Sequence, residues 1–131
     1  MKLFCLVVVL FSCYLNSIAQ DSLQATIVLI GDAGQLIKGH TPVLSGARNT
    51  VPFNNKTTIV FLGDNLYQTG LPDDATPNYA TKKAALDSQI IIARGTDAKV
   101  YMIPGNHDWQ NGGRGGYETI IRQQQYVDSY G

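Results

Sequence analysis

Residues 57–64 are Thr-Thr-Ile-Val-Phe-Leu-Gly-Asp, an apolar run that ends in a glycine followed by a polar residue. Two further stretches repeat this pattern: residues 25–32, Ala-Thr-Ile-Val-Leu-Ile-Gly-Asp, and residues 99–106, Lys-Val-Tyr-Met-Ile-Pro-Gly-Asn. Runs that are rich in β-branched and aromatic residues and apolar at nearly every position are typical of strands covered on both faces, as in a parallel sheet between helices. We therefore predict strands at 25–30, 57–62 and 99–103.

Helical patterns lie between and after these strands. Thr76 is expected to cap a helix over 77–94, with Pro77 at its first position and apolar residues at helical spacing. A short helix over 42–48 and a last helix over 117–130 complete the order β-α-β-α-β-α. The expected fold class is therefore α/β with mostly parallel strands.

The composition excludes several classes of protein. The 131 residues carry 10 Lys and Arg against 10 Asp and Glu, so the net charge is zero and no nucleic-acid partner held by a basic surface is expected. Hydrophobic residues make up 44% of the chain and charged residues 15%, which indicates a folded rather than a disordered chain.

The N-terminus has the features of an export signal. Lys2 precedes the apolar run 3–11, and residues 17–19, Ser-Ile-Ala, offer small side chains at positions −3 and −1 of a cleavage site before Gln20. A membrane-spanning helix needs about 20 apolar residues, more than this run provides. We predict a signal peptide at 1–19, a secreted or periplasmic protein, and no membrane span.

Both cysteines of the sequence lie in this predicted signal peptide. Cys5 and Cys13 both precede the expected cleavage site, so no disulfide is expected in the mature chain. A lipid anchor on Cys13 is the alternative, and the bulky Phe11 counts against it. Residues 20–131 are then expected to form one incomplete domain.

The three predicted strands each end beside oxygen-bearing side chains: Asp32, Asp64, and the Asn-His-Asp run at 106–108. In an open α/β sheet the ligand crevice lies at the carboxyl ends of the strands. Any one of these side chains could merely cap a helix. Clustered carboxylates, however, repel one another and are costly to desolvate unless a cation joins them. The pattern therefore favours a metal site.

These segments resemble the first three motifs of the calcineurin-like metallophosphoesterases. Residues 31–34 (Gly-Asp-Ala-Gly), 63–67 (Gly-Asp-Asn-Leu-Tyr) and 105–109 (Gly-Asn-His-Asp-Trp) occur in that order, each after a predicted strand. A first motif without histidine, and a tyrosine three residues after the second aspartate, resemble the purple acid phosphatase branch. The resemblance covers residues 25–131 and implies the N-terminal half of a metallophosphoesterase-type α/β sandwich.

The resemblance also implies a set of metal ligands. Asp32 and Tyr67 would bind a first metal ion, Asp64 would bridge two metal ions, and Asn106 would bind the second. A phenol, with an ordinary pKa near 10, becomes a ligand at neutral pH only beside a strongly polarising ion. The expected cofactors are two metal ions, Fe³⁺ plus a divalent Fe²⁺, Zn²⁺ or Mn²⁺.

The resemblance places His107 toward the substrate, a small phosphate ester. His107 would protonate the leaving group or clamp the phosphate, because imidazole changes protonation near neutral pH. Asp108 would orient His107, or cap the loop that follows. The implied activity is hydrolysis by a metal-activated hydroxide, and the acid phosphatase branch favours phosphomonoesters.

Such a site also needs histidines from a lone-His motif and a Gly-His-x-His motif, which this sequence does not contain. We therefore expect residues 1–131 alone to bind metal weakly and to be inactive, and the full-length parent to be the enzyme. Two alternatives stay open. One is a non-catalytic binding domain with the metallophosphoesterase fold. The other is an unrelated nucleotide-binding domain, although no Gly-x-Gly-x-x-Gly follows the first strand.

Overall fold

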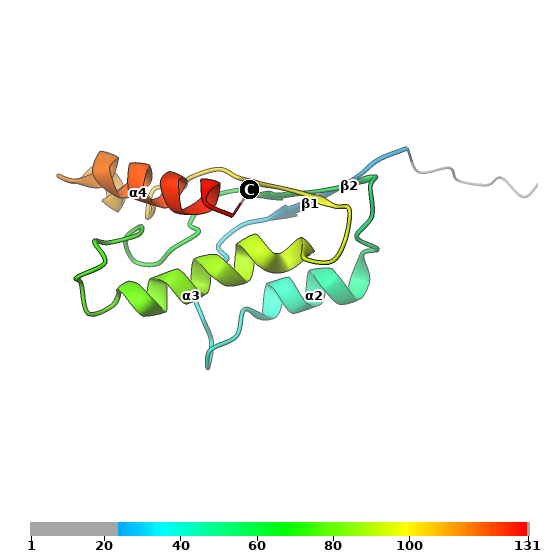
Figure 1. Cartoon of the computed structure of the whole chain (residues 1–131), viewed down its shortest axis with the longest axis horizontal. Coiled ribbons are helices and arrows are strands. Elements are labelled where there is room, and N and C mark those ends of the chain that lie inside the picture. The colour runs from blue at the N-terminus through cyan, green and yellow to red at the C-terminus, as the bar shows by residue number, and fades with distance from the viewer. Residues whose placement is uncertain (1–23, 131) are drawn as a thin grey trace, which may run out of the picture.

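A computed structural model describes residues 24–130 (Figure 1). The signal peptide predicted at 1–19 lies outside the described residues. Three strands, β1 (Thr26–Ile30), β2 (Thr57–Phe61) and β3 (Lys99–Met102), form one parallel sheet in the order β1-β2-β3. The α/β class and the three parallel strands are confirmed, and each strand boundary lies within one residue of its predicted position.

The helices follow the predicted order with shifted ends: α2 (Pro42–Thr50), α3 (Tyr79–Ile90) and α4 (Gly116–Asp128), with short 3₁₀ turns at η1 (Ile91–Ala93) and η2 (Gln110–Gly112). The predicted capping by Thr76 is wrong. Asn78 occupies the N-cap position without a side-chain hydrogen bond. Thr76 instead takes part in two turns, donating its backbone N–H to Asp73 and accepting from Tyr79, both at 2.9 Å. These turns delay the start of α3.

One face of the sheet carries the core. Ile59 and Phe61 of β2 are fully buried, and they pack against Leu44 of α2 and Ile92 of η1. Figure 1 shows α2 and α3 side by side along the same side of the sheet.

The opposite face of the sheet is open among residues 24–130. Ile27 and Leu29 of β1 are 66% and 61% exposed, and Tyr101 of β3 is 55% exposed. The expectation that helices cover both faces is therefore not met in the described part of the chain. The strands are apolar at successive positions, so their sequence does not show which face a helix covers.

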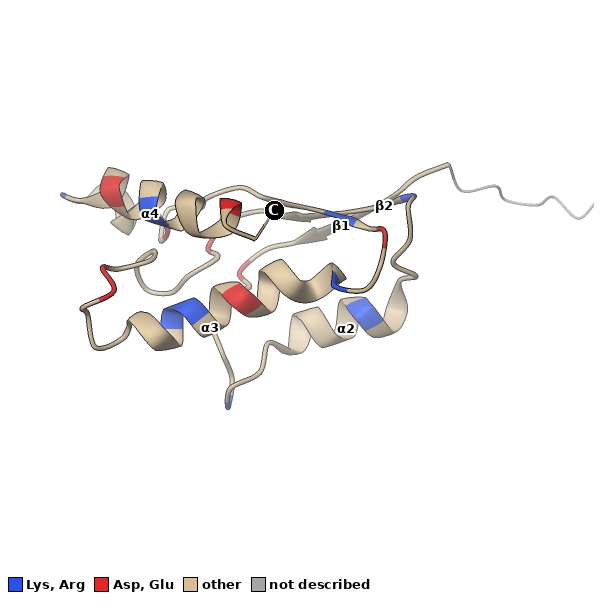
Figure 2. Ribbon diagram, viewed as in Figure 1, with Lys and Arg blue, Asp and Glu red and all other residues tan. Residues whose placement is uncertain are grey.

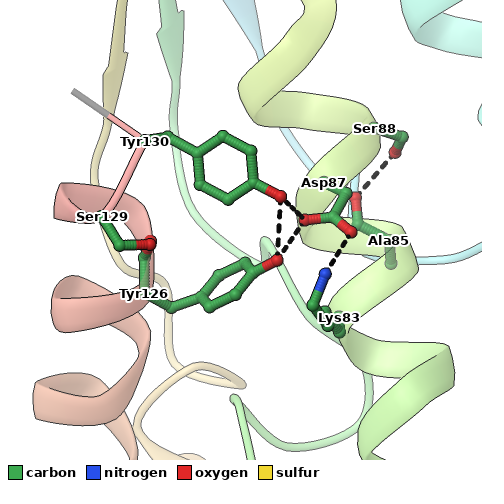
Figure 3. Close-up of polar contacts among 7 residues, drawn as sticks. All are labelled: Lys83, Ala85, Asp87, Ser88, Tyr126, Ser129 and Tyr130. Carbon is green, nitrogen blue, oxygen red and sulfur yellow. Dashed lines mark hydrogen bonds and ion pairs between the residues drawn. The ribbon is translucent and has the colours of Figure 1, made fainter.

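A second apolar cluster joins α3 to α4. Leu86 is fully buried there, and Tyr126 and Val127 of α4 pack against the cluster. Asp87 of α3 completes the contact. Its carboxylate accepts hydrogen bonds from the hydroxyls of Tyr126 and Tyr130, the latter at 2.6 Å, and pairs with the Lys83 ammonium at 2.9 Å (Figure 3). We call these four side chains (Lys83, Asp87, Tyr126 and Tyr130) the Asp87 cluster.

No helix within residues 24–130 is both long enough and apolar enough to span a lipid bilayer.

Candidate metal centre

The loops after the three strands meet at one end of the sheet because glycines allow their backbones to touch. A Cβ atom on Gly63 would lie 2.7 Å from the Cα of Gly105, and one on Gly34 would lie 2.5 Å from the backbone nitrogen of Leu66. Both distances are too short for any side chain. The N–H of Gly34 also donates to the carbonyl of Asp64 at 3.0 Å, which fixes the first loop against the second.

Asp32 and Asp64 both have left-handed backbone conformations. Their φ angles are 56° and 52°. Aspartate tolerates this region better than most residues, yet such a conformation costs about 1–3 kcal/mol and persists only where its surroundings enforce it. Strained residues concentrate at functional sites, so these two positions support the prediction that their carboxylates act together.

The Tyr67 hydroxyl lies between these two carboxylates. It donates to Oδ1 of Asp32 and lies 3.0 Å from Oδ2 of Asp64. The hydrogen bond to Asp32, then burial and the bond to Asp64, raise the pKa of the Tyr67 phenol above its ordinary value. The structure therefore brings together three of the four predicted metal ligands. The Tyr67 hydroxyl is within hydrogen-bond distance of both carboxylates.

This donor set fits a hard cation. Its atoms are oxygens, two from anionic carboxylates and one from a phenol that becomes anionic when a metal displaces its proton. No three His, Cys, Asp or Glu side chains gather anywhere within residues 24–130. The group formed by Asp32, Asp64 and Tyr67 thus contains only two carboxylates, and the phenol of Tyr67 provides its third oxygen.

Asn106, the fourth predicted ligand, directly precedes His107, whose backbone N–H binds Asp64. Its amide Nδ2 donates to Oδ1 of Asn111 at 2.7 Å, and its own Oδ1 accepts no hydrogen bond within the described chain. Its side chain makes no hydrogen bond to Asp32, Asp64 or Tyr67. Asn106 therefore has a free carbonyl oxygen, the atom that a cation would use.

His107 is attached to the cluster at two points. Its backbone N–H donates to Oδ1 of Asp64 at 3.2 Å, and its ring packs on the Tyr67 ring with centroids 4.6 Å apart. The ring Nδ1 lies 2.8 Å from the carbonyl oxygen of Gln68. Because a carbonyl can only accept, Nδ1 carries the proton and Nε2 is left for another partner.

Asp108 is fully buried, and its carboxylate is saturated with N–H donors. Oδ2 accepts from the backbone of Gly105 at 2.7 Å and of Asn65 at 3.0 Å, and also from the Asn65 side chain at 3.3 Å. Oδ1 accepts from the backbone of Leu66 at 3.0 Å and from the side chain of Gln123 at 3.2 Å. Asp108 therefore joins the second loop, the third loop and α4.

These contacts correct the predicted contact between Asp108 and His107. The hydrogen-bond partner of the His107 ring is the Gln68 carbonyl, on the loop after β2, and not the Asp108 carboxylate. The physical reason is that three backbone N–H groups surround Asp108 and would be buried without partners if the carboxylate turned away. Asp108 does not cap the loop that follows it either: its partners among residues 24–130 are Gly105 before it, Asn65 and Leu66 after β2, and Gln123 of α4.

Lys82 of α3 is a residue of the site that sequence reasoning missed. Its side chain is buried at 8% exposure, and its ammonium donates to the backbone carbonyls of Tyr67 and Thr69, the latter at 2.7 Å. Burial lowers the pKa of Lys82, and the negative charge of Asp108 opposes that shift. Helical spacing from Tyr79 and Leu86, three residues before and four after, was the available signal that Lys82 faces inward.

A cavity of about 560 Å³ opens beside Tyr67 and His107. It lies between the first loop and the start of α3, and its other lining side chains are mostly uncharged and polar: Gln35, Gln68, Asn78 and Thr81, with Leu36, Ala85 and the buried Lys82. The site thus has room for a ligand beside Tyr67 and His107.

Comparison with protein families agrees with this geometry. The family model for the calcineurin-like phosphoesterases matches residues 25–130, nearly all of the described chain, and the protein belongs to this family. Members are generally metal-dependent hydrolases of phosphoesters that bind a dinuclear metal site. Searches against curated proteins and against solved structures gave no match.

Proposed function

We propose that this protein is an exported phosphomonoesterase of the purple acid phosphatase type, which hydrolyses a small phosphate ester. The observation that carries the proposal is the position of the Tyr67 hydroxyl between the carboxylates of Asp32 and Asp64. A tyrosine ligand takes the place of the histidine that the first motif lacks. Among metallophosphoesterases this replacement is the mark of the acid phosphatase branch.

The chain's own residues then have distinct tasks. Asp32, Asp64 and Tyr67 would hold the metals, with Asn106 toward the second ion. The bound metals would supply a hydroxide nucleophile and neutralise charge on the phosphoryl oxygens. His107 presents Nε2 to the substrate because Gln68 occupies Nδ1, so a protonated ring can donate from Nε2 to the leaving alkoxide.

The phenol supports the choice of the first metal ion. The hydrogen bonds from Tyr67 to Asp32 and Asp64 raise the pKa of the phenol, and a strongly polarising ion such as Fe³⁺ would be needed to displace its proton at neutral pH. We propose Fe³⁺ in the site that includes Tyr67 and a divalent ion, Fe²⁺, Zn²⁺ or Mn²⁺, beside Asn106.

Export and the absence of a nucleic-acid partner are part of the same proposal. Residues 1–19 support a secreted or periplasmic location, with a lipid on Cys13 as the alternative that mass spectrometry of the mature N-terminus would reveal. Basic and acidic residues are interspersed along the ribbon (Figure 2), as expected for a small-molecule hydrolase rather than a nucleic-acid binder.

The full-length protein, purified with its metals, provides the test. We expect metal-dependent hydrolysis of p-nitrophenyl phosphate and a visible tyrosinate-to-iron absorption band. Tyr67→Phe should abolish the band and lower iron content, whereas Tyr101→Phe, on the open sheet face, should change neither. Hydrolysis without the band would replace iron with manganese or zinc. Metal binding without hydrolysis would favour the non-catalytic domain.

A further inference from the structure

Lys82 is a buried cation that none of the tasks above uses. Lysine is rarely buried unless its ammonium is paired or fully hydrogen-bonded, because desolvation of the charge is costly. Here the two acceptors are backbone carbonyls, those of Tyr67 and Thr69, on the loop that follows β2. The cost of burying this charge is therefore offset by holding that loop against α3.

The carbonyl between these two acceptors belongs to Gln68, and it contacts His107. Lys82 binds the residue before Gln68 and the residue after it, so the ammonium fixes the peptide units on both sides of that carbonyl. The Gln68 oxygen lies 2.8 Å from Nδ1 of His107. A single buried side chain thus binds the backbone on both sides of the carbonyl that is the hydrogen-bond partner of that ring among residues 24–130.

We propose that Lys82 is a positioning residue: it holds the 67–69 backbone so that the Gln68 carbonyl keeps the proton of His107 on Nδ1 and leaves Nε2 toward the substrate. The same contact holds the backbone of Tyr67, whose ring packs on the imidazole at a centroid distance of 4.6 Å. The catalytic consequence rests on the proposed phosphatase function. The structural part, control of the His107 tautomer, does not.

The decisive measurement is the tautomer of His107 in the metal-free protein at a pH where the ring is neutral. Long-range ¹H–¹⁵N correlation distinguishes Nδ1–H from Nε2–H by the nitrogen shifts, and a His107→Gln variant identifies the His107 signals by their loss. We expect the wild-type protein to hold Nδ1–H, and Lys82→Met to shift the ring toward a mixture with Nε2–H.

Lys83→Met is the matched control. It removes a neighbouring ammonium on the same helix that also makes a hydrogen bond, to Asp87 at 2.9 Å, but one remote from the loop. It should leave the His107 shifts unchanged. Where Lys82→Met does not fold, Lys82→Gln keeps N–H donors on a shorter side chain and should give a smaller shift in the same direction.

The outcome separates the two claims. If a folded Lys82→Met or Lys82→Gln variant shows the wild-type His107 shifts, the positioning role is overturned. If the shifts change and the full-length enzyme is active, kcat should fall by about tenfold or more with KM changed less, because the proton donor is misplaced. If the shifts change and the wild-type enzyme has no phosphatase activity, the positioning role stands and the proposed function fails.

Discussion

Asp108 and the pair Asp32 and Asp64 follow strands of the same sheet, yet they have opposite surroundings. Asp108 is fully buried and accepts five hydrogen bonds from N–H groups. Asp32 is exposed, Asp64 is half-buried, and both turn toward a phenol. Asp32 and Asp64 also have left-handed backbones, and Asp108 does not.

The difference separates a carboxylate that holds the fold from the two carboxylates that the proposed function assigns to a metal. Asp108 has its charge satisfied by the protein itself, so nothing further is needed to stabilise it. Asp32 and Asp64 share one phenolic proton between two negative groups, an arrangement that a cation would stabilise further. The number of internal N–H donors around each carboxylate is thus a better guide to its role than its position after a strand.

The largest effect is expected at Asp108. Asp108→Asn should lower the free energy of unfolding by about 3 kcal/mol, because the amide nitrogen replaces one carboxylate oxygen and then faces N–H donors, either those of Gly105 and Asn65 or those of Leu66 and Gln123. Urea unfolding followed by circular dichroism measures this loss. Asp32→Asn is the matched control and should cost less than about 1 kcal/mol. Equal destabilisation of the two variants would contradict the distinction drawn above.

Substitution of Asp32 should have the opposite balance: a small loss of stability and a large loss of activity. Asp32→Asn in the full-length enzyme is expected to lower kcat/KM by at least about 100-fold while the protein stays folded, because a metal ligand loses its charge. Steady-state kinetics with metal analysis of the same preparation provide the measurement. Retained metal content together with wild-type rates would remove Asp32 from the centre.

Much of the fold could be predicted because local pattern determined it. Each strand was recognisable from an apolar run that ends in glycine, and the parallel order required only connections long enough for a crossover. The open face of the sheet was not predictable. Ile27 and Leu29 are as apolar as their buried neighbours, and coverage depends on where α2 and α3 pack, which is a tertiary property.

The site divides in the same way. Asp32 and Asp64 were predictable from the strand ends that bring them together, and Tyr67 was predictable from the resemblance of residues 63–67 to a metallophosphoesterase motif. The tasks of Asp108 and Lys82 were not, because each depends on backbone groups of a loop distant in sequence. A sequence shows side chains at fixed spacing, but not which carbonyl or N–H group will need a partner once the chain folds.

The pH dependence of metal binding tests whether a metal displaces the phenolic proton of Tyr67. The raised pKa keeps the phenol protonated in the metal-free protein, so binding at this site releases a proton and becomes stronger as pH rises. Affinity for Fe³⁺ held in a citrate buffer should gain about tenfold more per pH unit in wild type than in Tyr67→Phe. Equal slopes of log affinity against pH in the two proteins would show that the phenol stays protonated.

Asp87 is intermediate between buried Asp108 and exposed Asp32. It is partly buried, and its carboxylate accepts hydrogen bonds from two phenols and an ammonium (Figure 3). Burial acts to raise the pKa of Asp87, but hydrogen bonds from Lys83, Tyr126 and Tyr130 outweigh it and lower the pKa. A lowered pKa in the folded state contributes stability above the unfolded value of about 3.9, and this contribution is lost as pH falls through the folded value.

The pKa of the Tyr126 phenol shifts in the opposite direction to that of Asp87. Burial, and then the hydrogen bond to Asp87, raise its pKa, so its contribution is complete below the unfolded value of about 10 and is lost as pH rises further. The Asp87 cluster should therefore hold α4 against α3 most strongly between about pH 4 and pH 10.

Asp87→Asn should lower the free energy of unfolding by about 1 kcal/mol at pH 7, a small value because the cluster is partly exposed, and by progressively less below pH 4. Thermal unfolding of both proteins across this range measures the difference, and a cost that stays constant down to pH 2 would show that the charge of Asp87 does not hold the two helices together.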